Sequence, residues 1–323
     1  IMASNSRRLA ALMCPSHANL MGNVHGGTIL NLLEQTGRVV STAYSRGPCA
    51  LVGAAGTEFR QPVRVGEVAT VDATVDYVGD HVMRVSMDVT AEEMASGTKR
   101  VTNTAKMWYS TIDIVRCEDD ANKSKAVVGS RSLLPLDPLL MAQDAIPEHE
   151  ASIKARESIP LNARVESEFP VRIHHLPGPD AIANHPFVSA GYILKLMDSG
   201  AALAAVAHTR HQCVTVLLDK VCFSTPIQFG DLCTVRAAVT FTSERSCEVV
   251  AQVWKSPSGI VGGLPDDHAS LAAVCAVEAR FIFVALDNNM KVVSIPELPV
   301  EKQRTKRWEV GASKHKERSG LRC

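Results

Sequence analysis

Apolar and polar residues alternate along several stretches of the chain with a period of two. Residues 69–77 and 83–89 show this alternation, and the same rhythm returns at residues 233–241 and 247–253. A period of two places successive side chains on opposite faces of a β-strand, so that one face is buried and the other is solvated. We therefore expect antiparallel strands in these stretches, with Asp80 at the turn that ends the first of them.

Two other stretches follow the three-to-four spacing of a helix that buries one face. They span residues 29–44 and 194–208. Gly26 and Gly27 open the first stretch, and residues without side chains let the backbone approach another group closely. Small residues dominate positions 200–205, which suits a helix surrounded on all sides. We therefore expect one buried helix in each half of the chain, ahead of the strands.

The same pattern occurs in both halves because the sequence repeats itself. Residues 59–67 correspond to residues 223–231, and residues 27–34 correspond to residues 191–198. Both pairs are 164 positions apart, and one offset across two separate elements indicates two copies of one fold. The strands that close the two copies are expected near residues 101–112 and 272–286.

A helix cradled by a long, curled antiparallel sheet is the hotdog arrangement, so we predict an α+β chain with two hotdog domains in tandem. We place them at residues 1–115 and 165–288, packed sheet edge to sheet edge so that neither edge is exposed. The segment 116–164 mixes charged residues with proline and is interpreted as a linker. The basic C-terminal tail, 289–323, is interpreted as a solvated end, with an electrostatic contact to a partner or ligand as the alternative.

Composition narrows the classes of function. The chain has 323 residues, about twice the length of a typical domain, and 46% hydrophobic with 21% charged residues indicates a globular protein. Its 34 basic residues balance 34 acidic ones, which argues against a partner with a nucleic-acid backbone. The apolar runs are shorter than the ~20 residues of a membrane span, so we expect a soluble chain.

The cysteines and the first residues bear on location. The 9 cysteines form no CxxC pair, and several sit among apolar neighbours as small core residues do, which favours a reducing, cytoplasmic compartment. The N-terminal residues contain no apolar signal core. Because the chain starts with Ile1 rather than Met, a mitochondrial form stays open as an alternative.

The most specific motif is Gly-Asn-Val-His-Gly-Gly-Thr at residues 22–28, directly before the first predicted helix. With Lys195–Asp198, the Phe-x-x-Pro-x-x-x-Gly turn of both repeats and the tandem arrangement, it resembles the acyl-CoA thioesterases that carry two hotdog repeats in one chain. The resemblance covers residues 8–113 and 166–287. It implies hydrolysis of fatty acyl-CoA to a free fatty acid and coenzyme A, with no cofactor because coenzyme A is part of the substrate.

The physical chemistry of the motif agrees with that reaction. Hydrolysis of a thioester needs hydrogen-bond donors where the carbonyl oxygen becomes negative, and a carboxylate that activates water. The first N–H groups of a helix are unpaired, and the helix dipole makes that end partly positive. Gly26 is our first choice for the donor and Gly27 our second, because neither has a side chain that blocks the approach of the oxygen.

The resemblance implies a carboxylate about two turns into each central helix, facing the glycine of the opposite repeat. These carboxylates are Glu34 and Asp198, so the chain has two composite positions for a site. One position combines Asn23 and Gly26 with Asp198. The other combines Glu34 with the start of the second helix.

Only the first of these sites is expected to be competent. At the start of the second helix, the counterparts of Asn23, His25 and Gly26 are Phe187, Ser189 and Ala190. Phe187 can neither position a water nor donate to an oxygen, and Ala190 crowds the approach to the backbone. The resemblance implies the same asymmetry. We therefore interpret Glu34 as a structural residue.

The remaining roles are assigned with their alternatives. Asp198 is the general base for water, or a nucleophile that forms a transient anhydride, and nothing in the sequence decides between them. A carboxylate on an apolar helix face is costly to bury without a purpose. Asn23 would orient the water or the carbonyl, or else cap the helix. His25 shapes the loop through a hydrogen bond to the backbone, or contacts the substrate.

Coenzyme A carries phosphates, which need cationic or N–H partners. Arg60 and Arg64 flank the turn at Pro62, and Arg245 follows the long strand of the second repeat, so we name these three as substrate-binding candidates. For each of them an ordinary solvated surface position is the alternative. The acyl chain is expected between the central helix and the sheet, and its preferred length does not follow from the sequence.

Several other functions were weighed against these residues. A hotdog hydratase would need an Asp-x-Asn-x-x-His loop, and a serine hydrolase would need a Gly-x-Ser-x-Gly turn. Neither motif occurs at the expected place. No phosphate-binding loop is present, and the histidine spacing suggests no zinc site, so no metal is expected. A non-catalytic acyl-CoA-binding module stays as the alternative, because the second repeat has lost its His-Gly-Gly. We expect a homo-oligomer, and the resemblance suggests a trimer of tandem chains.

Overall fold

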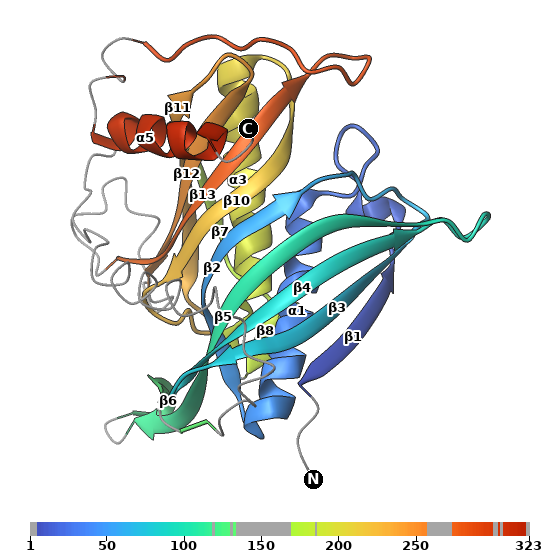
Figure 1. Ribbon diagram of the computed structural model, residues 1–323. Coiled ribbons are helices and arrows are strands. Elements are labelled where there is room, and N and C mark those ends of the chain that lie inside the picture. The colour runs from blue at the N-terminus through green and yellow to red at the C-terminus, as the bar shows by residue number, and fades with distance from the viewer. Residues whose placement is uncertain are drawn as a thin grey trace.

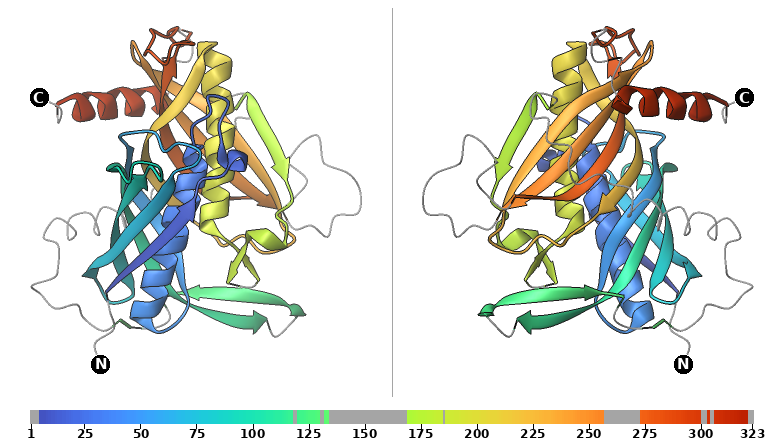
Figure 2. Two further views of the ribbon diagram at one scale, coloured as in Figure 1. Left: turned by 90° about the vertical axis from the view of Figure 1, so that its right-hand side faces the viewer. Right: turned by 90° about the vertical axis from the view of Figure 1, so that its left-hand side faces the viewer.

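The computed structural model describes residues 5–117, 120–129, 132–133, 169–184, 186–256, 273–299, 303 and 306–320. Two long helices, α1 (Gly26–Ser45) and α3 (Ala190–Thr209), lie side by side. A large curved sheet wraps around them (Figures 1 and 2). The helices therefore form the core of the molecule, and both halves of the sheet face them.

The first repeat surrounds α1 with strands in the order β1-β3-β4-β5-β2. Their bounds, with a short 3-10 helix η1, are β1 Ser6–Leu12, η1 Pro15–His17, β2 Cys49–Phe59, β3 Val68–Val78, β4 Val82–Glu92 and β5 Lys99–Cys117. The alternating stretches 69–77 and 83–89 lie inside β3 and β4, whose registers bury Val71, Val75 and Val85. The predicted closing strand lies inside β5.

The second repeat has the equivalent strand order, β7-β11-β12-β13-β10. Its elements are β7 Val171–His175, η4 Pro179–Ala181, β8 Ile182–Asn184, β9 Phe187–Val188, β10 Gln212–Phe223, β11 Leu232–Thr242, β12 Ser246–Ser256 and β13 Val274–Leu286. The two alternating stretches predicted for this half lie inside β11 and β12. The equal order in both halves confirms the tandem hotdog prediction.

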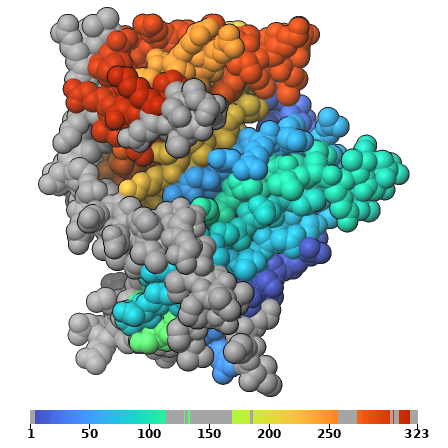
Figure 3. Space-filling view, viewed as in Figure 1, coloured from blue at the N-terminus to red at the C-terminus, as the bar shows by residue number. Residues whose placement is uncertain are grey.

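The two half-sheets join through one edge strand of each. β2 pairs with β10 in antiparallel register, from Leu217 opposite Glu58 to Cys222 opposite Gly53, and the result is one 11-stranded sheet. In the space-filling view the two repeats meet along this pair of strands (Figure 3). The backbone groups of both strands are thus paired with each other, which is the edge-to-edge packing that the repeat predicts.

Helix α3 is more apolar than α1, which follows from its surroundings. Its length and hydropathy would also fit a membrane span, but half of the apolar window is buried inside the fold. Ile193, Leu194 and Met197 are fully buried there, and Gly200 lies so close to Val235 that a methyl group would collide with it. These features are those of the core helix of a globular domain.

Two segments differ from their sequence-based interpretation. Strand β5 continues to Cys117 and pairs with β6 (Asp120–Val128), so regular structure extends into the segment taken as a linker. The tail forms helix α5 (Lys306–Gly320), which packs on the outside of the second half-sheet (Figure 1). Gly311 lies against Phe241, and Lys314 forms an ion pair of 2.6 Å with Asp219. The helix is docked rather than frayed.

Candidate active site

The site is built where α1 and α3 cross. A methyl group on Gly27 would lie 2.8 Å from the Cα atom of Lys195, and one on Gly191 would lie 3.0 Å from the Cα atom of Asn31. These four positions correspond through the offset of 164 residues, so the crossing is pseudo-twofold symmetric. Glycine permits the close approach, and it brings the start of each helix beside the carboxylate of the other.

Asp198 lies at the start of α1 with both carboxylate oxygens held. Its side chain is 1% exposed. Oδ2 accepts a hydrogen bond of 2.7 Å from the Gly27 N–H and lies 3.0 Å from His25 Nδ1. Oδ1 accepts a hydrogen bond of 2.7 Å from the Thr215 hydroxyl. The positive end of the α1 dipole and these donors stabilise the buried negative charge.

The two glycines that the sequence ranked as oxyanion donors have different surroundings. The Gly27 N–H is directed at Asp198, whereas the Gly26 N–H donates to no group in the described part of the chain. A methyl group on Gly26 would lie 3.1 Å from Asp198 Oδ2 and 3.1 Å from Thr215 Oγ. The Gly26 N–H is therefore the open donor, directly beside the carboxylate.

The Nδ1 atom of His25 has two alternative partners: without a proton it accepts from the Gly27 N–H and caps helix α1, and with a proton it donates to Asp198. This nitrogen lies 3.1 Å from the Gly27 N–H and 3.0 Å from Asp198 Oδ2. Burial lowers the pKa of His25, but the hydrogen bond to Asp198 and the charge of Asp198 outweigh this, so that its pKa is raised above the usual value. Protonated His25 donates to Asp198 and adds to the stabilisation of the carboxylate.

Asn23 and Asn19 form the loop that leads into α1. Both line the same pocket as Asp198. The Asn19 Oδ1 accepts hydrogen bonds from the backbone N–H groups of Met21 (2.9 Å) and Asn23 (3.1 Å), and Asn19 N–H donates to the Asn23 carbonyl (2.7 Å). The Asn19 oxygen is thus used to hold the loop, while its amide N–H groups remain to donate into the pocket.

Sequence reasoning missed Asn19 and Thr215, although the repeat contains a signal for both. The counterpart of Asn19 in the other copy is Ala183, and the counterpart of Thr215 is Leu51. Each pair shows a polar residue beside Asp198 and an apolar residue beside Glu34. Comparing the copies position by position, beyond the motif itself, would have found both residues.

The pocket around Asp198 has a volume of about 760 Å³ and is lined by residues of both repeats. The loops 18–24 and 59–63 and strand β5 contribute the polar residues Asn19, Asn23, Arg60, Gln61 and Asn103, which lie among apolar ones. The C-terminal half of α3 and strands β10 and β13 contribute mainly apolar residues. These include Ala202, Val206, Val214, Val216, Phe283 and Leu286. Asp198, His25 and Gly26 also line this pocket.

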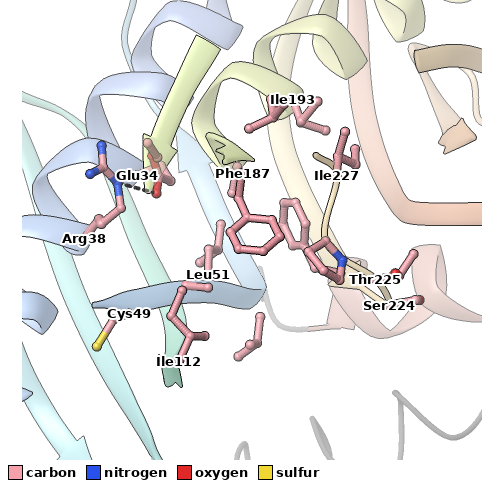
Figure 4. A pocket seen from close by; sticks show the side chains of 17 residues that line it. Glu34, Arg38, Cys49, Leu51, Ile112, Phe187, Ile193, Ser224, Thr225 and Ile227 are labelled. Atoms are coloured by element: carbon pink, nitrogen blue, oxygen red, sulfur yellow. Dashed lines mark hydrogen bonds and ion pairs between the residues drawn. The ribbon is translucent and has the colours of Figure 1, made fainter. Parts of the chain in front are cut away.

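The pseudo-symmetric position around Glu34 is nearly filled. Its pocket has a volume of about 120 Å³, and the ring of Phe187 lies inside it between Leu51 and Ile227 (Figure 4). Glu34 accepts a hydrogen bond from the Ser189 hydroxyl (3.0 Å) and pairs with Arg38 at 3.3 Å. Burial raises the pKa of Glu34 in spite of these partners.

The three arginines predicted to bind the phosphates lie in different places. Arg60 lines the mouth of the Asp198 pocket and contacts Glu58 at 3.0 Å. Arg64 is exposed at the neighbouring turn, where its backbone bridges to Asn23. Arg245 lies at the turn between β11 and β12, contacts Glu244 at 3.5 Å and does not line the pocket. Of the three arginines, Arg60 therefore lines the Asp198 pocket, whereas Arg64 and Arg245 do not.

Fold and site together define a tandem hotdog protein with one open and one filled site between its repeats. The model of the thioesterase superfamily matches residues 21–98 and 185–261, one segment in each repeat. In both repeats the chain is similar to this superfamily. Both matched segments contain the start of a central helix and its carboxylate, so the shared region coincides with the crossing of α1 and α3.

Relatives match nearly the whole chain. The cytosolic acyl coenzyme A thioester hydrolase of Mus musculus is 28% identical over 95% of this chain and 81% of its own. The Homo sapiens protein of the same name is 28% identical over 94% of this chain and 81% of its own. A solved acyl-CoA hydrolase from Agrobacterium tumefaciens is 18% identical, with 90% of this chain and 97% of that chain covered and a TM-score of 0.34.

Proposed function

We propose that this protein is an acyl-CoA thioesterase, which hydrolyses fatty acyl-CoA to a free fatty acid and coenzyme A. One observation carries the proposal: a buried carboxylate, Asp198, lies beside the open N–H of Gly26 at a helix start, inside a pocket of about 760 Å³. The relatives that match both repeats are named acyl coenzyme A thioester hydrolases, which supports the same reaction.

The chemistry follows from this arrangement. The thioester carbonyl oxygen faces the Gly26 N–H, and a water molecule lies between the carbonyl carbon and Asp198. Asp198 takes a proton from this water while the oxygen of the water bonds to the carbonyl carbon. The Gly26 N–H and the α1 dipole stabilise the negative charge that develops on the carbonyl oxygen. The tetrahedral species then expels the thiolate of coenzyme A, which takes up the proton.

The neighbours of Asp198 favour its role as a general base. Thr215 holds one carboxylate oxygen, and Gly27 with His25 holds the other, so a covalent attack would have to break one of these contacts. A nucleophile must bring its own oxygen to the thioester carbon, whereas a general base acts through a water molecule and can stay in place. Asn19 and Asn23 line the pocket near this point, and we assign them to orienting the water or the carbonyl.

The lining of the pocket suits both ends of the substrate. The apolar side chains along α3 suit an acyl chain, because a chain buried there leaves water. Arg60 lines the pocket, and its cation suits a phosphate of coenzyme A. Arg64, at the neighbouring turn, stays a candidate for the same role. The reaction uses only groups of this chain, water and the substrate, so the proposal includes neither a metal nor a separate cofactor.

A non-catalytic binding module is the less supported alternative. Loss of the His-Gly-Gly motif is confined to the copy whose pocket Phe187 fills, and the Asp198 site keeps its carboxylate, its open donor and its cavity. We also propose a cytosolic location, since the relatives are named cytosolic. The homo-oligomer, and a trimer of tandem chains in particular, stays a prediction.

The decisive experiment compares two matched carboxylate variants. Asp198→Asn keeps the shape of the side chain but cannot accept a proton, so we expect kcat/KM for palmitoyl-CoA to fall by on the order of 100-fold or more. Glu34→Gln makes the same change at the filled site, and activity should stay within a few-fold of the wild type. The readout is thiol release followed with a thiol reagent, with thermal unfolding as the test of folding.

The opposite pattern would refute the assignment. If Glu34→Gln abolishes thiol release while Asp198→Asn retains it, the site lies at Glu34. Saturable binding of acyl-CoA by the wild type without any thiol release would instead establish the binding module.

A further inference from the structure

Asn103 is a buried polar residue that the reaction described above does not use. It lies on β5 opposite Phe59 of β2 and is 1% exposed. Its Oδ1 is completely covered and accepts no hydrogen bond within the described part of the chain. The residue lines the Asp198 pocket. An amide in this position is costly to bury, because an unsatisfied acceptor loses its hydrogen bonds to water.

The second repeat shows that the fold does not need an amide here. Val277 of β13 pairs with Phe223 of β10, just as Asn103 of β5 pairs with Phe59 of β2. Val277 is fully buried, so an apolar side chain satisfies the packing at this register position. The polar residue thus lines the open pocket, whereas its apolar counterpart does not line the filled one.

The position of Asn103 in the pocket indicates the kind of ligand group it meets. The neighbouring loop is fixed to β5, because the N–H groups of Arg60 and Gln61 donate to the Thr102 carbonyl at 2.9 and 3.2 Å. Arg60 of this loop lines the same pocket as Gly26 and Asp198. If an acyl-CoA places its thioester at Asp198 and a phosphate at Arg60, the amide N–H groups of its pantetheine arm lie between these two points.

We propose that Asn103 is a specificity-determining residue that accepts a hydrogen bond from an amide N–H of the pantetheine arm of coenzyme A. This inference rests on the proposed function, because it assumes that a thioester occupies the Asp198 pocket. Asn103 distinguishes thioesters of pantetheine from thioesters whose leaving group has no amide. A site that hydrogen-bonds a ligand N–H discriminates strongly against analogues that lack it, because its own buried polar group is then left unpaired.

Thr57 offers a matched control. Its Oγ is also buried and has no hydrogen-bond partner in the described part of the chain, and the residue is 0% exposed. It lies on β2, two positions before Phe59, but it does not line the pocket. Thr57→Val therefore removes a buried unsatisfied polar atom in the same part of the sheet without touching the ligand.

The test measures hydrolysis of two substrates by Asn103→Val, Thr57→Val and the wild type. The substrates are one acyl-CoA and the mercaptoethanol thioester of the same acid, which has no amide. For Asn103→Val we expect KM for the acyl-CoA to rise about tenfold, because one hydrogen bond is lost and the ligand amide is left unpaired. We expect kcat to stay within about twofold of the wild type. Neither the mercaptoethanol thioester nor the Thr57→Val variant should show a change beyond about twofold.

Direct binding separates this inference from the proposed function. Isothermal titration of free coenzyme A should show about tenfold weaker binding to Asn103→Val than to wild type. This comparison decides on Asn103 even if the wild type releases no thiol, an outcome that would refute the hydrolase alone. Equal changes for both substrates, or unchanged binding together with a loss of thermal stability, would overturn the inference and indicate a water-bonded structural amide. If Asn103→Val does not fold, Asn103→Leu replaces it.

Discussion

At the scale of single residues, one carboxylate is distinguished by its neighbours rather than by its burial. Asp198 and Glu34 are equally buried, yet Thr215 faces the first, and Arg38 neutralises the second. The counterpart of Arg38 is Ala202, which lines the open pocket. Arg38 thus lies beside Glu34 at the position that is equivalent to Ala202 in the open pocket. The two carboxylates therefore have different chemistry in the same fold.

His25 gives a pH-dependent prediction. Because its pKa is raised in the folded protein, the stability it contributes is fully present below its ordinary pKa of about 6.5 and is lost as the pH rises through the raised value. His25→Asn keeps a capping side chain but does not titrate. We expect the difference in unfolding free energy between wild type and variant, measured by urea denaturation, to shrink as the pH rises from about 6 to 8.

A difference that grows with pH would contradict this assignment. His211→Asn is a suitable control, since His211 is exposed and lies outside the Asp198 pocket. Its effect on the unfolding free energy should not follow the same trend.

The residues of the site differ in how far the sequence reveals them. Asp198 and Gly26 could be predicted, because a repeated motif and a carboxylate on an apolar helix face are local signals. Thr215 and Asn103 carry no such local signal. Thr215 is revealed only by comparing the two copies position by position, and the role of Asn103 depends on the strand curvature that brings it to the pocket. Asn103 in particular lies in a strand whose sequence pattern does not show that its polar side chain is buried at a pocket.

At the scale of elements, the start of α1 is the part that carries the chemistry. In its first turn the Gly27 N–H donates to Asp198, and the Gly26 N–H stays open. Both positions depend on a backbone without side chains at Gly26 and Gly27. The start of α3 has Ala190 at the position of Gly26. The comparison shows that one methyl group separates an accessible helix start from an obstructed one.

Gly26→Ala should therefore reduce turnover while the fold is kept. The added methyl group lies 3.1 Å from both Asp198 Oδ2 and Thr215 Oγ, so these groups must shift by a few tenths of an ångström. Because displacements of this kind at reacting groups are costly, we expect kcat to fall by on the order of 10- to 100-fold. Steady-state kinetics with palmitoyl-CoA measure this. Ala190→Gly at the filled site is the control, and an equal loss there would contradict the argument.

Elements with periodic patterns could be predicted, and those held only by tertiary contacts could not. The stretches that alternate or follow a helical spacing correspond to β3, β4, α1 and α3. Helix α5 consists largely of charged residues, and its position depends on Gly311 fitting against Phe241 and on the pair Lys314–Asp219. Nothing in the tail itself indicates this docking, because the partner residues lie far away in the sequence.

At the scale of the whole molecule, the repeat predicts the architecture but not the difference in volume between the two pockets. The open pocket has about 760 Å³ and the filled one about 120 Å³, although the helices cross symmetrically. Substitutions such as Phe187 for Asn23 explain which pocket is filled. The size of the open pocket depends on how loops 18–24 and 59–63 and the strands of both halves meet around it.

This asymmetry predicts a stoichiometry of one ligand per chain. A non-hydrolysable thioether analogue of palmitoyl-CoA, titrated calorimetrically, should bind with one site per 34.8 kDa chain. Phe187 and Arg38 occupy the second position, so no further equivalent is expected. Two sites of similar affinity would show that the Glu34 pocket opens, and the assignment of a single working site would then be wrong.

The continuous pairing of β2 with β10 also bears on how such a protein can change over generations. In an assembly of identical subunits, each inherited substitution alters every copy of a shared pocket at once. Here the halves are covalently joined and differ in sequence, so one mutation modifies a single cavity and spares its twin. Loss of one reaction centre therefore leaves the other intact, although each centre is built from residues of both halves.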